Sequence, residues 1–105
     1  MRLEEKVKAI QFVIDNPNSG EVYYKLLEDM NALKTNYWDY MTTEPIDCDV
    51  ELERLSEADF DLCAALLTML LREDHFSNGA LEERHRKGQV IPVLERLVEL
   101  LEQER

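Results

Sequence analysis

Residues 70–88, "LLREDHFSNGALEERHRKG", place two acids and a histidine beside a turn and a cluster of bases. Ionisable groups with perturbed pKa values in a cleft are typical of a functional site, so Arg72 and His75 are candidate ligand-binding residues. Acids at the carboxyl end of a helix face the negative end of its dipole, so Glu73 and Asp74 need positive partners. A corner held by ion pairs between two helices explains the same composition, and we favour it. The candidate partners are Arg72, Arg84, His85 and Arg86.

An aromatic segment gives the second candidate site. Trp38 and its tyrosine neighbours, with Asp39 between them, could wall a small-molecule pocket. The same rings could fill space beside the helices with their polar tips at the surface. We favour that interpretation, because a 12.4 kDa domain needs aromatic volume in its core. Taken together, the candidate ligand-binding residues are Tyr37, Trp38, Asp39, Tyr40, Arg72 and His75.

Metal and thiol chemistry find little support in the sequence. A calcium loop that began at Asp47 would need glycine and glutamate where the chain has Leu52 and Ala58. The two histidines are ten positions apart and lack the spacing of paired zinc ligands. Cys63 lies in an apolar run, and Cys48 lies between acids, which raise the pKa of a thiol. We therefore expect no catalytic residue, no metal and no cofactor.

Acids outnumber bases by twenty-three to twelve, which gives a net charge of −11. A field of that sign disfavours binding to nucleic acid and to anionic membranes. Residues 44–61, the acidic stretch, hold eight acids and one base, so imitation of a nucleic acid stays open. The first ten residues are charged and unlike a signal peptide, and the apolar run 62–71 is too short to span a bilayer, which needs about twenty residues. These features predict a cytoplasmic protein.

Apolar periodicity predicts the elements that position these residues. Residues 3–15 place apolar side chains at three-to-four spacing, which indicates an amphipathic helix. A second helix is predicted to begin at Asn18 or Ser19, either of which can cap it. Residues 37–41 are predicted to form a short helix or an ordered loop, and residues 44–55 a short helix or an extended linker.

The apolar run is expected to form a buried central helix at about residues 57–73, with Ser56 as its cap. Ser77 or Asn78 is predicted to start the next helix, and Gly88 suits the left-handed position past its end. An amphipathic helix completes the chain. The 105 residues are therefore predicted to form a single all-α domain, a compact bundle of five to seven helices around the central one.

The stretch "LLTMLLREDHFSNGALEERHRKGQVIPVLERL", residues 66–97, resembles the C-terminal motif of a family of small bacterial proteins of unknown function. In that family a helix with LLT leads to an arginine, an RF-like pair and a glycine, and a later glycine precedes a helix that ends in RL. His75 stands where that family has an arginine. The resemblance covers about a third of the chain and implies an all-helical fold with no assigned reaction. The matching positions are Leu66, Leu67, Thr68, Arg72, Phe76, Gly79, Gly88, Arg96 and Leu97.

Three functions are compatible with these patterns. We expect a non-enzymatic cytoplasmic binding protein that acts through a protein partner or its own copy. The acidic stretch and the basic residues 84–87 could pair reciprocally across a two-fold axis, meet within one chain, or face water. One alternative is a small-ligand-binding protein or enzyme that uses residues 37–41 and the corner at Arg72–His75. The other alternative is an acidic mimic of nucleic acid. Convergence of the candidate residues on one cavity would favour the small ligand.

Overall fold

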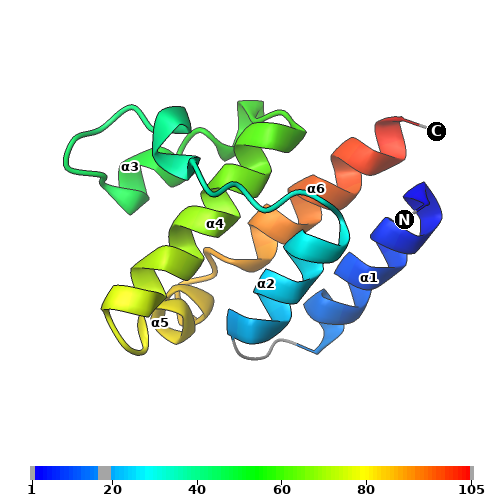
Figure 1. Cartoon of the computed structure of the whole chain (residues 1–105), viewed down its shortest axis with the longest axis horizontal. Coiled ribbons are helices and arrows are strands. Elements are labelled where there is room, and N and C mark those ends of the chain that lie inside the picture. The colour runs from blue at the N-terminus through cyan, green and yellow to red at the C-terminus, as the bar shows by residue number, and fades with distance from the viewer. Residues whose placement is uncertain (1, 17–19, 105) are drawn as a thin grey trace.

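A computed structural model describes residues 2–16 and 20–104, and within those ranges every regular element is helical (Figure 1). The described chain has six α-helices and two 3₁₀-helices, within the predicted range of five to seven helices. The radius of gyration is 12.7 Å, close to the ~13 Å of a compact domain of this length. The elements are α1 (Leu3–Asp15), α2 (Gly20–Asp29), η1 (Tyr37–Tyr40), α3 (Cys48–Leu52), η2 (Leu55–Glu57), α4 (Phe60–Phe76), α5 (Ala80–Arg86) and α6 (Ile91–Gln103).

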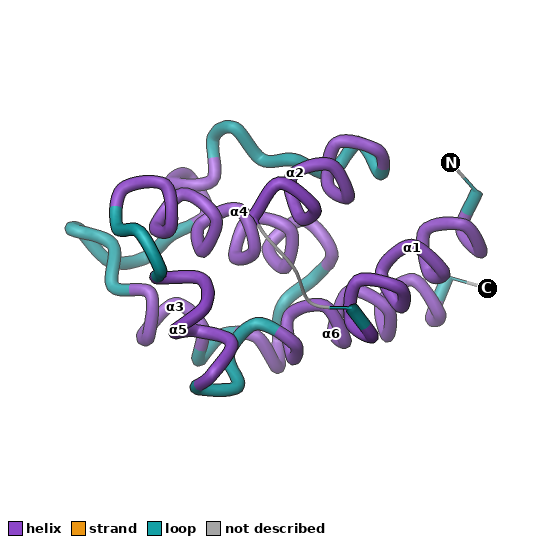
Figure 2. Tube along the Cα trace, turned by 90° about the horizontal axis from the view of Figure 1, so that it is seen from below, coloured by secondary structure: helices purple, strands orange, loops and turns teal. Residues whose placement is uncertain are grey.

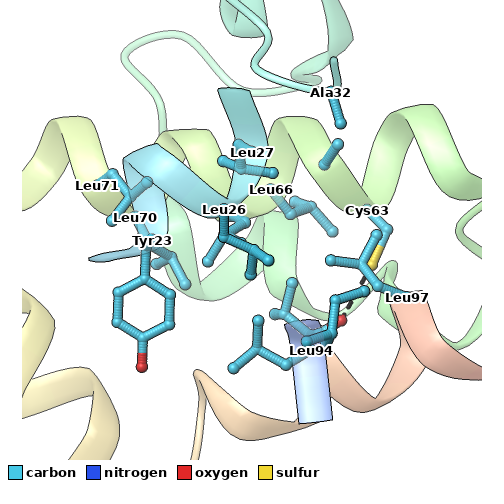
Figure 3. Packing of buried hydrophobic residues seen from close by; sticks show 14 of the residues in the cluster. Tyr23, Leu26, Leu27, Ala32, Cys63, Leu66, Leu70, Leu71, Leu94 and Leu97 are labelled. Carbon is cyan, nitrogen blue, oxygen red and sulfur yellow. Dashed lines mark hydrogen bonds between the residues drawn. The ribbon is translucent and has the colours of Figure 1, made fainter. Parts of the chain in front are cut away.

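Helix α4 is the axis of the bundle, as the apolar run predicts. All residues from Cys63 to Leu71 are buried, so this helix needs neighbours on every side, and α2, α5, α6 and η1 contact it. Thr68 is the polar residue of that run, and its hydroxyl donates to the Ala64 carbonyl at 2.8 Å. Figure 3 shows leucines of three helices meeting in this core: Leu26 and Leu27 of α2, Leu66 and Leu70 of α4, and Leu94 and Leu97 of α6.

The first and last helices lie side by side in both views (Figures 1 and 2). Helix α1 buries Ile10 and Val13 there, and α6 buries four apolar residues on its inward stripe. Arg96 of α6 is partly buried, and its Nε and Nη2 atoms donate to the Ala58 carbonyl at 3.2 and 2.9 Å. These bonds tie the last helix to the segment that leads into α4.

The central helix begins and ends three residues later than the predicted 57–73. Ser56 is not its cap, because that residue lies in η2. Asp59 takes the capping position instead, and its carboxylate accepts from the Leu62 N–H at 2.8 Å. Serine and aspartate are about equally good caps, so local sequence does not decide between two such residues ahead of one apolar run.

The next helix also begins later than predicted, at Ala80 rather than at Ser77 or Asn78. The residue before it is Gly79, whose φ of +89° is a conformation that glycine adopts readily. The cap comes from another element, because the Asp74 carboxylate accepts from the N–H of Leu81. Gly88 has a φ of +71° and confirms the predicted left-handed position past the end of α5.

Both uncertain segments contain short helices. Residues 37–41 include η1, and residues 44–55 include α3, which Asp47 caps by accepting from the Val50 N–H at 3.2 Å. The predicted start of α2 at Asn18 or Ser19 lies outside the described residues. Among the helices of the described ranges, none has both the length and the apolar character that crossing a membrane requires.

Candidate functional site

The corner between α4 and α5 is held by an ion pair and a capping hydrogen bond, and an ion-paired corner is the arrangement that we favoured from the sequence. Arg84 donates to Glu73 from Nε at 2.9 Å and from Nη2 at 2.8 Å, and to Asp49 from Nη1 at 2.6 Å. The Arg84 hydrogen bonds hold the pKa of Glu73 below its ordinary value. Asp74 binds the Leu81 N–H at 3.0 Å. Both acids of the corner therefore have partners, and these contacts join the helices.

The two histidines have separate surroundings. His75 is exposed, and its ring meets the Phe76 ring edge-on at a centroid distance of 5.1 Å. His85 is half-buried, and its Nε2 lies 2.7 Å from the hydroxyl of the buried Tyr23 on α2. Burial lowers the pKa of His85 and raises that of Tyr23 to about 12. The His85–Tyr23 pair therefore joins α5 to α2 in the neutral form of both side chains.

An aromatic face lies where η1 packs on α4, and we use this name for Tyr37, Trp38, Arg72 and Phe76. Trp38 is 58% exposed and Phe76 is 78% exposed. Tyr37 and Arg72 line two clefts at once, one of about 250 Å³ and one of about 210 Å³. Trp38 belongs to the larger, first cleft, and Phe76 to the smaller, second cleft. The two clefts are therefore neighbours on one surface.

Ring contacts hold this face together. Tyr37 and Trp38 meet edge to face, with centroids 5.5 Å apart and planes at 76°. The guanidinium carbon of Arg72 lies 5.7 Å from the centroid of the Phe76 ring, within the range of a cation–π contact. Tyr37 is partly buried against the core, as a space-filling ring should be, but more than half of the Trp38 surface faces solvent.

Three of the six candidate residues from the sequence meet at the first cleft. Tyr37, Trp38 and Arg72 line it, although α4 and η1 are far apart in sequence. The other three line neither cleft, and one of them, Tyr40, has Lys34 Nζ 5.9 Å from its ring centroid. The residues outside both clefts are Asp39, Tyr40 and His75.

Phe76 and Lys34 are site residues that the sequence reasoning missed. Phe76 follows the acids of the corner, and its position in the last turn of α4 exposes it beside Arg72. Lys34 lines the first cleft and forms an ion pair with Asp61 at 2.9 Å. A helical pattern extended through residue 76 could have placed Phe76 one turn after Arg72.

Glu51 is a buried carboxylate that the sequence did not distinguish from its neighbours. Its oxygens accept from the backbone N–H groups of Thr42 and Thr43 at 2.9 and 2.8 Å, from both hydroxyls, and from Arg54 Nη1 at 2.9 Å. Burial alone would raise the pKa of Glu51, but these hydrogen bonds outweigh it and lower the pKa to about 2. The carboxylate thereby ties α3 to the loop that follows η1.

Both cysteines have strongly raised pKa values, which makes them poor nucleophiles. Burial is the main cause at each, raising the pKa of Cys48 and of Cys63 to about 12, and Glu73 adds to the effect at Cys48. The Cys63 thiol donates to the Val93 carbonyl at 3.3 Å, drawn as the dashed line in Figure 3. Within residues 2–16 and 20–104, no group of three or more histidine, cysteine, aspartate or glutamate side chains is placed to hold a metal ion.

The acidic stretch and the basic residues 84–87 meet within one chain, where Arg84 pairs with Asp49. Glu51 is buried, and the exposed Asp61 is paired with Lys34, so the acids of this stretch do not form a uniform strip of free carboxylates. A nucleic-acid mimic would need such a strip. This intrachain pair also uses Arg84, one of the bases that could otherwise pair with the acidic stretch of a second copy.

The fold and the site define a small all-α protein with an exposed aromatic face beside an ion-paired corner. The chain belongs to a family of unknown function (DUF6508), which matches residues 1–103. The resemblance to a helical family of unknown function is thus confirmed, over nearly the whole chain rather than the third that carries the motif. No curated protein and no solved structure matches the chain.

Proposed function

We propose that this protein is a non-enzymatic binding protein that holds a segment of a partner protein on its aromatic face. The observation that carries this proposal is that Tyr37 and Arg72 are shared by two clefts, with the exposed rings of Trp38 and Phe76 beside them. Tryptophan, tyrosine and arginine are the residues that most often dominate binding energy in protein interfaces. Large exposed apolar side chains that gather in one place typically mark an interaction surface.

The size of the clefts supports a chain segment as the occupant. Small-molecule pockets usually enclose roughly 300–1,000 Å³, and the two clefts measure about 250 and 210 Å³. Each suits one or two side chains, and neighbouring side chains of one segment could enter both. The rings between them would then be covered from both sides, which is the setting in which an interface side chain contributes most.

A small-ligand-binding protein is the second candidate, because Tyr37, Trp38 and Arg72 converge on the first cleft. That cleft alone would hold the ligand, and Phe76 would have no part in binding. We propose the cytoplasm as the location in either case, since both cysteines are free thiols, as is usual in a reducing compartment.

Affinity capture from the native cells tests the proposal when it compares three forms of the protein. The parent is compared with a Trp38→Ala, Phe76→Ala double variant and with Phe12→Ala, a matched control because Phe12 is 67% exposed on α1. We expect a protein that the parent and the control retain and that the double variant loses. Once purified, that protein should bind the double variant at least about thirtyfold more weakly, the effect of losing a dominant contact.

Capture of the same proteins by all three forms would show that binding does not use the aromatic face. A small molecule that copurifies with the parent and Phe76→Ala, but not with Trp38→Ala, would favour the second candidate instead.

A further inference from the structure

We infer that the aromatic face recognises a carboxylate side chain of the partner, next to an apolar side chain, through Arg72. This inference rests on the proposed function and names the chemistry of the segment that the face holds. The first observation is the charge of the first cleft. Lys34 and Arg72 line it and no acid does, on a chain in which acids outnumber bases by twenty-three to twelve.

The second observation is that Arg72 has no acidic partner of its own. Among the described residues, no carboxylate lies within 4.0 Å of its guanidinium nitrogens, whereas Lys34 is bound to Asp61 at 2.9 Å. The Arg72 guanidinium lies over the Phe76 ring instead. A guanidinium group carries five N–H donors in a planar fork that fits the two oxygens of a carboxylate. Arg72 can therefore offer such a fork to an incoming group.

The third observation is the apolar surface around this cation. Leu33, Tyr37 and Trp38 line the first cleft with Arg72, and Phe76 packs against its guanidinium group. A partner segment that covered these rings would exclude water from the ion pair, and the attraction between two charges is stronger where water is excluded. The surface thus suits a carboxylate and an apolar side chain that are close together in one segment.

Net charge limits the kind of partner. The −11 of the chain repels a strongly acidic protein at long range, because like-signed fields slow association. The segment therefore carries its carboxylate locally, on a protein that is not strongly acidic overall. Selectivity then comes from Arg72 and not from the average charge of this protein.

Trp38 gives a direct optical signal for the test, because it is the single tryptophan of the chain and it lines the first cleft. The probes are the dipeptide acetyl-phenylalanyl-aspartyl-amide and its asparaginyl counterpart, which differ only in the charged group. We expect the aspartyl peptide to shift the tryptophan emission with a millimolar Kd, about what so few atoms can reach. The asparaginyl peptide should bind roughly three- to tenfold more weakly.

Two variants assign the difference to one side chain. Arg72→Gln should remove the preference for the aspartyl peptide, so that the two peptides bind this variant with equal affinity. Arg86→Gln is the matched control, since that arginine is on α5 with 66% of its side chain exposed and lines neither cleft. It should keep the preference of the parent.

Equal binding of the two peptides, with no effect of Arg72→Gln, would overturn the inference and leave the proposed function standing. Acetyl-phenylalanine carries its carboxylate at the chain terminus. If it binds more tightly than the aspartyl peptide, the face recognises a chain terminus and the inference of a side-chain carboxylate is overturned. No change in emission with any of these probes would also overturn the inference. The capture experiment with the double variant would then decide the proposed function by itself.

Discussion

Arg84 holds the carboxylate of Glu73 through two parallel hydrogen bonds of 2.9 and 2.8 Å. A third donor of the same guanidinium group reaches Asp49 of α3 at 2.6 Å. Only 12% of the Arg84 side chain is exposed, and 25% of the Glu73 side chain. One arginine of α5 therefore connects α3 and α4, and its pair with Glu73 is largely shielded from solvent, where such contacts count most.

Arg84→Gln should lower the free energy of unfolding by about 2–3 kcal/mol, because it leaves the partly buried Glu73 carboxylate without its charged partner. Arg86→Gln is the control, since Arg86 is exposed and pairs with Glu82 and Glu83 on its own helix. That change should cost less than about 0.5 kcal/mol. Urea unfolding of the three proteins measures both values, and equal midpoints would contradict this role of Arg84.

Glu51 should make stability depend on pH in the acid range. Its pKa in the folded protein is about 2, below the ordinary value of 4.5, so its contribution is complete above about pH 4.5. As the pH falls from 4.5 toward 2, the unfolded chain binds a proton that the folded chain does not, and this contribution is lost. Glu51→Gln should be less stable at pH 7 by on the order of 2 kcal/mol. The difference between it and the parent should shrink toward pH 2, and a difference that stays constant would contradict the assignment.

His85 should also make stability fall as the pH falls, in a higher pH range than Glu51. Burial lowers its pKa below 6.5, so below that pH the unfolded chain takes up a proton more readily than the folded chain. Stability from this group is therefore complete above about pH 6.5 and falls as the pH falls through the folded pKa. An NMR titration of the His85 imidazole checks this, and a midpoint at or above pH 6.5 would contradict it.

Apolar periodicity was enough to predict the fold class and most helices, because burial of a stripe or a run decides where a helix lies. Helix ends were predicted less well. The cap of α5 comes from Asp74 on the preceding helix, and a contact of that kind depends on how two elements pack. For the same reason the sequence does not distinguish Glu51 from the other acids of its stretch. Its burial depends on the loop bearing Thr42 and Thr43, which packs over it in the fold.

Three of the six candidate residues meet at one cleft, and their role in binding stays a prediction. Residue type alone singled out Tyr37, Trp38 and Arg72, and the structure brings them to one cleft. The sequence joined His75 to Arg72 because the two residues are close along the chain, yet His75 lines neither cleft. Packing of η1 on α4 decides which residues meet, and local sequence does not contain that pairing.

Self-association is one form that a protein partner could take, and we propose a homodimer at protein concentrations of roughly tens of micromolar, where an interface of modest area becomes populated. The intrachain pair of Arg84 and Asp49 means that apolar contacts outside the aromatic face would have to supply most of its stability. Light scattering at rising concentration should then show a mass that climbs from 12.4 kDa toward twice that value. A mass that stays at 12.4 kDa would contradict the homodimer.

The central claim is that another protein contacts the aromatic face, and site-specific photo-crosslinking in the native cells tests it most directly. Photoreactive benzoylphenylalanine would replace Trp38, Phe76 or, as the control, Phe12, all of which are exposed. We predict a discrete protein adduct from the first two positions upon irradiation and none from the third. No adduct at positions 38 and 76, or the same adducts at all three, would contradict the account.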